Sequence, residues 1–179
     1  LNIPYEQIKQ GLADLKTLAG RMEIINQGQN FSVLVDYAHE PKSMGLALQA
    51  AEKLIQDGSK LIVLLGAEGG GRDKTKRPKM GELAGKLADI VVVSNVDPYD
   101  DNPLEIIEDI AKTAEKAGKV RNQNLFAIED RREGIKKCLQ LAQKGDVVLI
   151  TGKGAEQLMI IKGRRIPWDD RNVVRDELR

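Results

Sequence analysis

Glycines and basic residues are concentrated in the segment 66–77, where their types and spacing suit the binding of an anion. Gly69–Gly71 permit positive φ angles and a close approach of the backbone to a ligand. Arg72, Lys74, Lys76 and Arg77 follow at the expected start of a helix, where backbone amides and the helix dipole also favour negative charge. The segment therefore predicts an anion site; taken alone, it is also compatible with a flexible, solvated basic loop.

Three further polar clusters follow apolar segments of strand length. They are 36–41, which holds Asp36, Tyr37 and His39; 94–103; and 151–156, which holds Gly152, Lys153 and Glu156. Ligands of open parallel sheets bind beyond the carboxyl ends of the strands, so the four clusters predict one functional edge. Taken singly, His39 also suits a structural role, and Gly152-Lys153-Gly154 a simple turn.

The composition excludes several classes of protein. A net charge of +1 over 179 residues argues against a globally basic nucleic-acid binder. A single histidine, His39, excludes a multi-histidine metal site, and a single cysteine, Cys138, excludes an internal disulfide and suits a reducing compartment; we expect Cys138 to fill the core. The chain has no Walker P-loop, and no G-x-G-x-x-G segment in the context of a nicotinamide-dinucleotide site, which disfavours a Rossmann-type dehydrogenase.

The sequence also lacks an apolar run near the ~18 residues that span a bilayer and lacks a signal peptide, so we expect a cytoplasmic protein with no membrane partner. It begins at Leu1 rather than methionine, which suggests a fragment.

Strand-like and helix-like segments alternate along the chain. The expected strands are 21–26, 30–35, 60–65, 90–93, 124–128 and 146–150, and the expected helices are 4–15, 42–56, 77–88, 103–116 and 130–143. A short hairpin, 157–162 with 164–166, and a last helix capped by Asp169 or Asp170 complete the chain. Continuous apolar runs are typical of strands covered on both faces. The pattern predicts an α/β, Rossmann-like fold with a mostly parallel sheet of about six strands and flanking helices.

Several motifs occur together in an order that resembles the C-terminal part of the Mur ligases, and most closely their MurE branch. They are Arg21-Met22-Glu23, Asp36-Tyr37-Ala38-His39-x-Pro41, Gly70-Gly71-Arg72-Asp73-Lys74-x-Lys76-Arg77-Pro78, Gly152-Lys153-Gly154-x-Glu156 and Asp169-Asp170-Arg171. The resemblance covers nearly the whole chain. Of the sister ligases considered, other Mur enzymes and folylpolyglutamate synthases, none matches the second and fourth motifs as well.

The resemblance implies an ATP-dependent ligase that activates the carboxylate of UDP-MurNAc-L-Ala-D-Glu as an acyl phosphate, which the amine of a free amino acid attacks. It implies three domains, with ATP and Mg²⁺ bound mainly by a central domain. Residues 1–19 would be the tail of that central domain and 20–179 the C-terminal amino-acid-binding domain. The partners would be the UDP-sugar peptide, the amino acid and the protein's own upstream domains. The fragment alone would hold no catalytic residue and be inactive.

The resemblance also assigns roles to residues. Those expected to bind the amino acid are Arg72, Asp97, Tyr99, Asp101, Gly152 and Glu156, with Arg72 on a carboxylate. Those expected to face the nucleotide are Asp36, Tyr37, His39, Lys74 and Arg77, with a loop-ordering role also open for Lys74 and Arg77. No residue is expected to bind a metal. The alternatives are a stand-alone module that binds an amino acid or a nucleotide, and another ligase of the superfamily.

Two positions depart from the family pattern. The diaminopimelate enzymes carry Asp-Asn-Pro-Arg where this chain has Val96-Asp97-Pro98-Tyr99, so the cation expected for a distal carboxylate is missing. Asp100 and Asp101 beside Glu156 would favour a distal ammonium, as in L-lysine; alternatively, they cap the helix that begins at Pro103. Ala155 stands where the family often has histidine, so the family pattern does not predict the geometry around Glu156.

Overall fold

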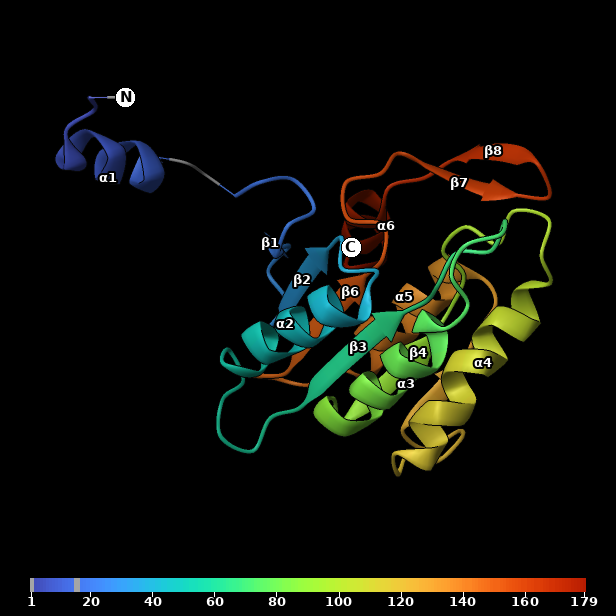
Figure 1. The fold of residues 1–179 in the computed structure, drawn as a ribbon. Helices are drawn as coiled ribbons and strands as arrows, with labels where there is room; N and C mark the ends of the chain where they lie inside the picture. The colour runs from blue at the N-terminus through green and yellow to red at the C-terminus, as the bar shows by residue number, and fades with distance from the viewer. Residues whose placement is uncertain (1, 15–16) are drawn as a thin grey trace.

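The computed structural model describes residues 2–14 and 17–179, and Figure 1 shows a layered α/β arrangement with α1 apart from it. The helices are α1 (Tyr5–Asp14), α2 (Pro41–Glu52), α3 (Lys76–Leu87), α4 (Pro103–Lys116), α5 (Arg131–Leu141) and α6 (Asp170–Glu177). The strands are β1 (Glu23–Ile25), β2 (Ser32–Asp36), β3 (Leu61–Leu65), β4 (Ile90–Val93), β5 (Leu125–Ala127), β6 (Val147–Thr151), β7 (Leu158–Ile161) and β8 (Arg164–Pro167). Among these described residues, no helix has the length and apolar character needed to cross a bilayer.

Six strands form one sheet in the order β1-β2-β6-β3-β4-β5, and all neighbours are parallel except β1, which runs antiparallel to β2. This confirms the predicted mostly parallel sheet of about six strands. The last of these strands along the chain, β6, is inserted between β2 and β3. The expected hairpin is also present as β7 and β8, which pair antiparallel outside the main sheet.

Both faces of the sheet are covered, as the continuous apolar runs predict. Alternate residues of β3 separate to opposite faces: Leu61, Val63 and Leu65 pack with α2, α3 and α4, whereas Ile62 and Leu64 pack with α5 and α6. Figure 1 shows α2, α3 and α4 in front of the sheet and α5 and α6 behind it. Cys138 of α5 lies fully buried where α5 and α6 pack on the sheet, and burial raises the pKa of its thiol. The prediction that it fills the core is confirmed.

The end of the second helix differs from the expectation, whereas the cap of the last helix is one of the two residues predicted for it. The second helix ends at Glu52 rather than 56, because Leu54 and Ile55 donate to carbonyls three residues back and the chain turns away. At the last helix, Asp169 is the N-cap and accepts from the Arg171 amide, whereas Asp170 begins the helix and is buried. The predicted first helix is α1, although position 15, its expected end, lies outside the described residues.

Glycine at position 81 permits the close contact between α3 and α4. A Cβ there would lie 2.1 Å from the Ile110 carbonyl oxygen and 2.2 Å from Thr113 Oγ1. We expect Gly81→Ala to lower the free energy of unfolding by about 2–3 kcal/mol, measured by urea denaturation. The control is Gly45→Ala in α2, where the nearest atoms are 4.0 Å away and alanine should add about 0.5–1 kcal/mol. Equal effects of the two substitutions would contradict the packing argument.

Candidate functional site

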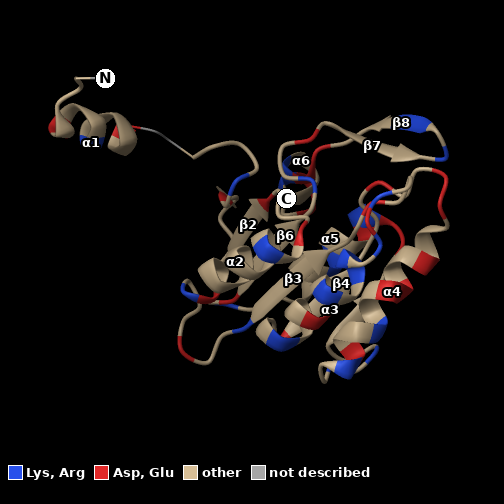
Figure 2. Cartoon of the chain, in the orientation of Figure 1, with Lys and Arg blue, Asp and Glu red and all other residues tan. Residues whose placement is uncertain are grey.

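A pocket of about 270 Å³ lies at the carboxyl ends of the parallel strands, where the sequence predicts the functional edge. It is lined from the loops after β2, β3, β4 and β6 by Tyr37, His39, Glu40, Glu68, Arg72, Lys76, Asp97, Tyr99 and Glu156. Arg72 and Glu156 therefore face one shared cavity. Figure 2 shows acidic and basic residues mixed along the loops at this edge, with further basic residues on β8.

Close contacts between the loops hold the pocket together. The Gly69 amide donates to the Asp97 carbonyl at 2.8 Å, and a Cβ on Gly66 would lie 2.1 Å from the Ser94 carbonyl oxygen. Since only glycine avoids that clash, Gly66 lets the loops after β3 and β4 meet. The β7–β8 hairpin is joined to the loop after β4, because the Tyr99 amide donates to the Ile160 carbonyl at 3.1 Å.

One side of the pocket holds a lysine between two carboxylates, which we name the Lys153 triad (Asp97, Lys153 and Glu156). Lys153 Nζ lies 2.8 Å from Asp97 Oδ2 and 2.7 Å from Glu156 Oε2. The lysine is fully buried, whereas the Glu156 side chain is 41% exposed and can meet a ligand. The other Glu156 oxygen accepts from the Tyr37 hydroxyl at 3.1 Å. Burial and the Glu156 carboxylate both raise the pKa of Tyr37, so the phenol stays protonated as the donor.

A second lysine is held in the same way, in what we name the Lys76 triad (Glu40, Lys76 and Glu68). Lys76 Nζ lies 2.9 Å from Glu40 Oε1 and 2.6 Å from Glu68 Oε2. Burial alone would raise the pKa of Glu68, but the hydrogen bond from Lys76 outweighs it and lowers that pKa. Burial alone would lower the pKa of Lys76, and its two carboxylate partners raise it instead. Glu68 and Lys76 are therefore both charged at neutral pH.

The basic segment after β3 differs from the predicted cluster of four cations. Lys76 and Arg77 are buried and paired with carboxylates, whereas Arg72 and Lys74 are exposed. Arg77 contacts Asp109 Oδ2 at 3.0 Å and the Glu68 carbonyl at 3.2 Å, so it orders the loop. Of the four cations predicted to form the anion site, only Arg72 and Lys74 are exposed, because the carboxylates of Glu40, Glu68 and Asp109 neutralise the other two.

Other predicted residues lie outside the pocket. Asp101 Oδ2 is 3.9 Å from Arg77, and Asn102, not Asp100 or Asp101, caps α4. Gly152 is buried, and a Cβ there would meet Val96 at 3.1 Å. Lys74 lines a separate groove beside α4.

Part of the motif around Asp36 stabilises local structure. Asp36 accepts from the backbone amides of Met22 and Ala38, both at 2.8 Å, which leaves its carboxylate engaged within the domain. His39 Nδ1 lies 2.8 Å from the Tyr37 carbonyl, and the two rings meet edge to face at 4.5 Å. Arg21 covers the Tyr37 ring at 4.3 Å. Of this motif, Tyr37 and His39 reach the pocket.

A fully buried ion pair supports the strand ends beneath the pocket. Arg131 donates to both carboxylate oxygens of Asp170, at 2.8 and 2.7 Å. It also donates to the Asn95 and Thr151 carbonyls, at 3.0 and 2.7 Å, which lie at the ends of β4 and β6. Trp168 Nε1 adds a donor to Asp170 at 2.8 Å. The pair therefore fastens α6 to the strand ends that carry the site.

The resemblance assigned no individual role to Glu40, Glu68, Lys76 or Lys153, although Lys76 and Lys153 belong to clusters of the predicted functional edge. Their motifs were noticed, but a lysine flanked by glycines suits a plain turn equally well, and nothing local marks it as buried. The only signal would have been the number of charged residues placed at one edge of an apolar sheet, where an unpaired charge is costly.

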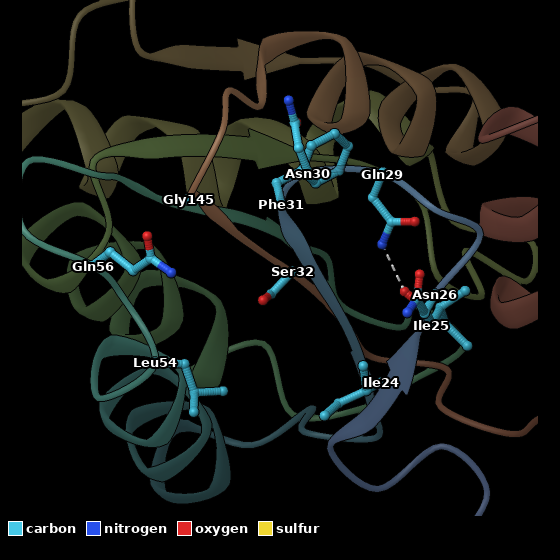
Figure 3. Close-up of a pocket in the computed structure, with 10 residues that line it drawn as sticks. All are labelled: Ile24, Ile25, Asn26, Gln29, Asn30, Phe31, Ser32, Leu54, Gln56 and Gly145. Carbon is cyan, nitrogen blue, oxygen red and sulfur yellow. Dashed lines mark hydrogen bonds between the residues drawn. The ribbon is translucent and has the colours of Figure 1, made fainter.

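A second cavity of about 330 Å³ lies at the other end of the sheet, by the start of β2 (Figure 3). Its lining includes Asn26, Gln29 and Gln56 and no charged residue, and Gln29 Nε2 donates to the Ile25 carbonyl at 2.9 Å. It offers no charged side chain to a ligand. Among the residues the structure describes, no cluster of three or more His, Cys, Asp or Glu is arranged to hold a metal ion.

Several known proteins are similar to this chain in sequence and fold. A protein of Caldanaerobacter subterraneus named UDP-N-acetylmuramoyl-L-alanyl-D-glutamate–2,6-diaminopimelate ligase is 40% identical, over 99% of this chain and 35% of its own length. The UDP-N-acetylmuramyl-tripeptide synthetase of Treponema denticola is 41% identical over 90% of this chain and 30% of its own length. The chain thus spans about a third of these curated relatives.

A solved structure titled as a UDP-N-acetylmuramoyl-L-alanyl-D-glutamate–2,6-diaminopimelate ligase superposes with a TM-score of 0.80 at 31% identity, covering 97% of this chain and 35% of that one. The family model described as "Mur ligase, glutamate ligase domain" matches residues 20–154. This chain therefore belongs to the Mur ligase family.

Proposed function

We propose that this chain is the amino-acid-binding domain of an ATP-dependent ligase that adds a diamino acid to UDP-MurNAc-L-Ala-D-Glu, with L-lysine preferred over meso-diaminopimelate. The observation that carries the proposal is the shared pocket with Arg72 on one wall and Glu156 on another. A guanidinium binds a carboxylate through two parallel hydrogen bonds. Arg72 would hold the amino acid's carboxylate and Glu156 its distal ammonium.

The charges of the pocket support a ligand with two ammonium groups and one carboxylate. Each triad has two carboxylates and one lysine and so a formal charge of −1 at neutral pH. Arg72 adds one positive charge, so the two triads and Arg72 together carry a formal charge of −1. L-Lysine carries the complementary +1. The second carboxylate of diaminopimelate would face Tyr99, and the two pocket lysines are already paired.

The domain's own contribution is to bind and orient. The chain has no P-loop, and its described residues contain no cluster of three or more His, Cys, Asp or Glu arranged to hold a metal ion, so we assign ATP and Mg²⁺ to the upstream domains. Holding the amine against a reactive acyl group replaces a bimolecular encounter by a positioned one, and closure of the domains would exclude water. Tyr37 and His39 at the pocket edge would face the nucleotide. The UDP-sugar peptide would bind upstream, and we place the reaction in the cytoplasm.

We also propose that residues 1–19 belong to the central domain. None of the residues of α1 is buried, and its exposed Tyr5, Ile8 and Leu12 lie on one helical face. Figure 1 shows α1 apart from the sheet. Such a face would pack against preceding parts of a longer chain. Positions 1, 15 and 16 of this segment lie outside the described residues.

The test is an amino-acid panel with the full-length protein, ATP, Mg²⁺ and UDP-MurNAc-L-Ala-D-Glu. We expect kcat/KM for L-lysine to exceed that for meso-diaminopimelate by about 10–100-fold, the effect of one or two partly desolvated charge pairs. Tyr99→Arg should move the ratio about tenfold toward diaminopimelate, because it supplies the missing cation. A wild-type protein that prefers diaminopimelate would contradict the lysine assignment, and one that ligates no amino acid would contradict the function.

A further inference from the structure

Lys153 is the most completely enclosed charged group at the site. Its side chain is 1% exposed, and both of its carboxylate contacts are within 2.8 Å. A buried ammonium is costly unless it is fully paired, so its place between Asp97 and Glu156 is specified by the fold. Gly154 supplies the turn that directs it inward: its φ is +55°, and a Cβ there would lie 2.8 Å from the Gly20 carbonyl oxygen.

Lys153 also connects parts of the chain that are distant in sequence. Its partner Asp97 uses the second oxygen, Oδ1, to accept from the Ile160 amide at 2.8 Å. The loop after β4 and the β7–β8 hairpin are thereby fixed to the turn after β6. Glu156 is then held from two sides, by Lys153 on Oε2 and by the Tyr37 hydroxyl on Oε1. An exposed glutamate would otherwise sample several rotamers.

We propose that Lys153 is a positioning residue that sets the specificity of the pocket for a distal ammonium, by holding the Glu156 carboxylate in one orientation and neutralising one of the two carboxylates beside it. Being buried, Lys153 does not touch the amino acid. The inference rests on the proposed function, in which Glu156 receives that ammonium. Two unshielded carboxylates would repel each other, whereas the Lys153 triad presents a single negative charge.

The experiment compares L-lysine with L-norleucine, which lacks only the distal amine, as substrates of the full-length protein. The decisive variant is Asp97→Asn with Lys153→Met. It keeps the formal charge of the triad at −1 and leaves an amide oxygen for the Ile160 amide, so it removes the hold on Glu156 without leaving Asp97 charged and unpaired. Lys153→Met alone is the harsher version, and Lys144→Met, an exposed lysine before β6, is the control.

We expect the double variant to lower the discrimination in favour of L-lysine about tenfold, chiefly through a higher KM for L-lysine. The lysine-to-norleucine ratio of kcat/KM should fall by the same factor, and Lys144→Met should leave it unchanged. An unchanged ratio, or equal losses on both substrates, would overturn the role of Lys153. A wild-type protein that ligates neither substrate, or does not discriminate between them, would instead contradict the proposed function on which the inference rests.

Discussion

Replacing Asp170 with asparagine is expected to lower the free energy of unfolding by about 3–5 kcal/mol. The side chains of Asp170 and Arg131 are both 0% exposed, and the guanidinium has no access to water. Asparagine keeps an oxygen for hydrogen bonding but loses the charge, so a buried cation remains without compensation. The carbonyls of Asn95 and Thr151 are held by the same guanidinium and would lose part of their fixed geometry.

The matched control is Arg132→Met. Arg132 is the next residue of α5 and also pairs with α6, through Asp176 and Glu177, but its side chain is 43% exposed. An exposed pair contributes about 0–1 kcal/mol, so this variant should be close to the wild type. Urea denaturation followed by circular dichroism measures both. Similar losses for the two variants would show that burial does not decide the strength of the Arg131–Asp170 pair.

Replacing Arg72 with methionine is expected to raise KM for the amino acid about 100-fold, with the fold intact. Arg72 is exposed at the pocket wall, so its removal leaves no buried partner unpaired. A charge-assisted contact of about 1.5–3 kcal/mol corresponds to about 10–150-fold in affinity. Arg72→Lys should fall between the two, because an ammonium keeps the charge and loses the second parallel hydrogen bond.

Steady-state kinetics of the full-length protein, with the amino acid varied, measure this effect. Lys79→Met is the control, since Lys79 is an exposed cation of α3 outside the residues that line the pocket. It should alter KM by less than about twofold if loss of a surface charge has only a screened effect. If Arg72→Met behaves like Lys79→Met, the carboxylate does not bind at Arg72.

The fold could be predicted further than the site. Runs such as Leu61–Leu65 and Val147–Thr151 have the period and composition of buried parallel strands, and the structure pairs them side by side. The end of α2 was misplaced because Leu54 and Ile55 continue its apolar pattern, and an apolar pattern does not encode where backbone hydrogen bonding stops.

At the site, the sequence predicted the edge of the sheet at which the residues lie, but not which of them pair with one another. Arg72 and Glu156 follow strands whose carboxyl ends must meet, so their presence in one pocket could be expected. The engagement of Asp97 by Lys153, 56 positions away, depends on the order of strands across the sheet. That order places β6 between β2 and β3, and the chain's local patterns do not reveal it.

The late position of β6 in the sequence has a consequence for biosynthesis. Until residues 147–151 leave the ribosome, β2 and β3 have no strand between them, since neither pairs with the other in the finished sheet. A nascent chain would therefore expose two apolar strand edges through most of its synthesis, and such edges are sites of aggregation. Chaperone binding to ribosome-bound chains should end abruptly once this strand emerges.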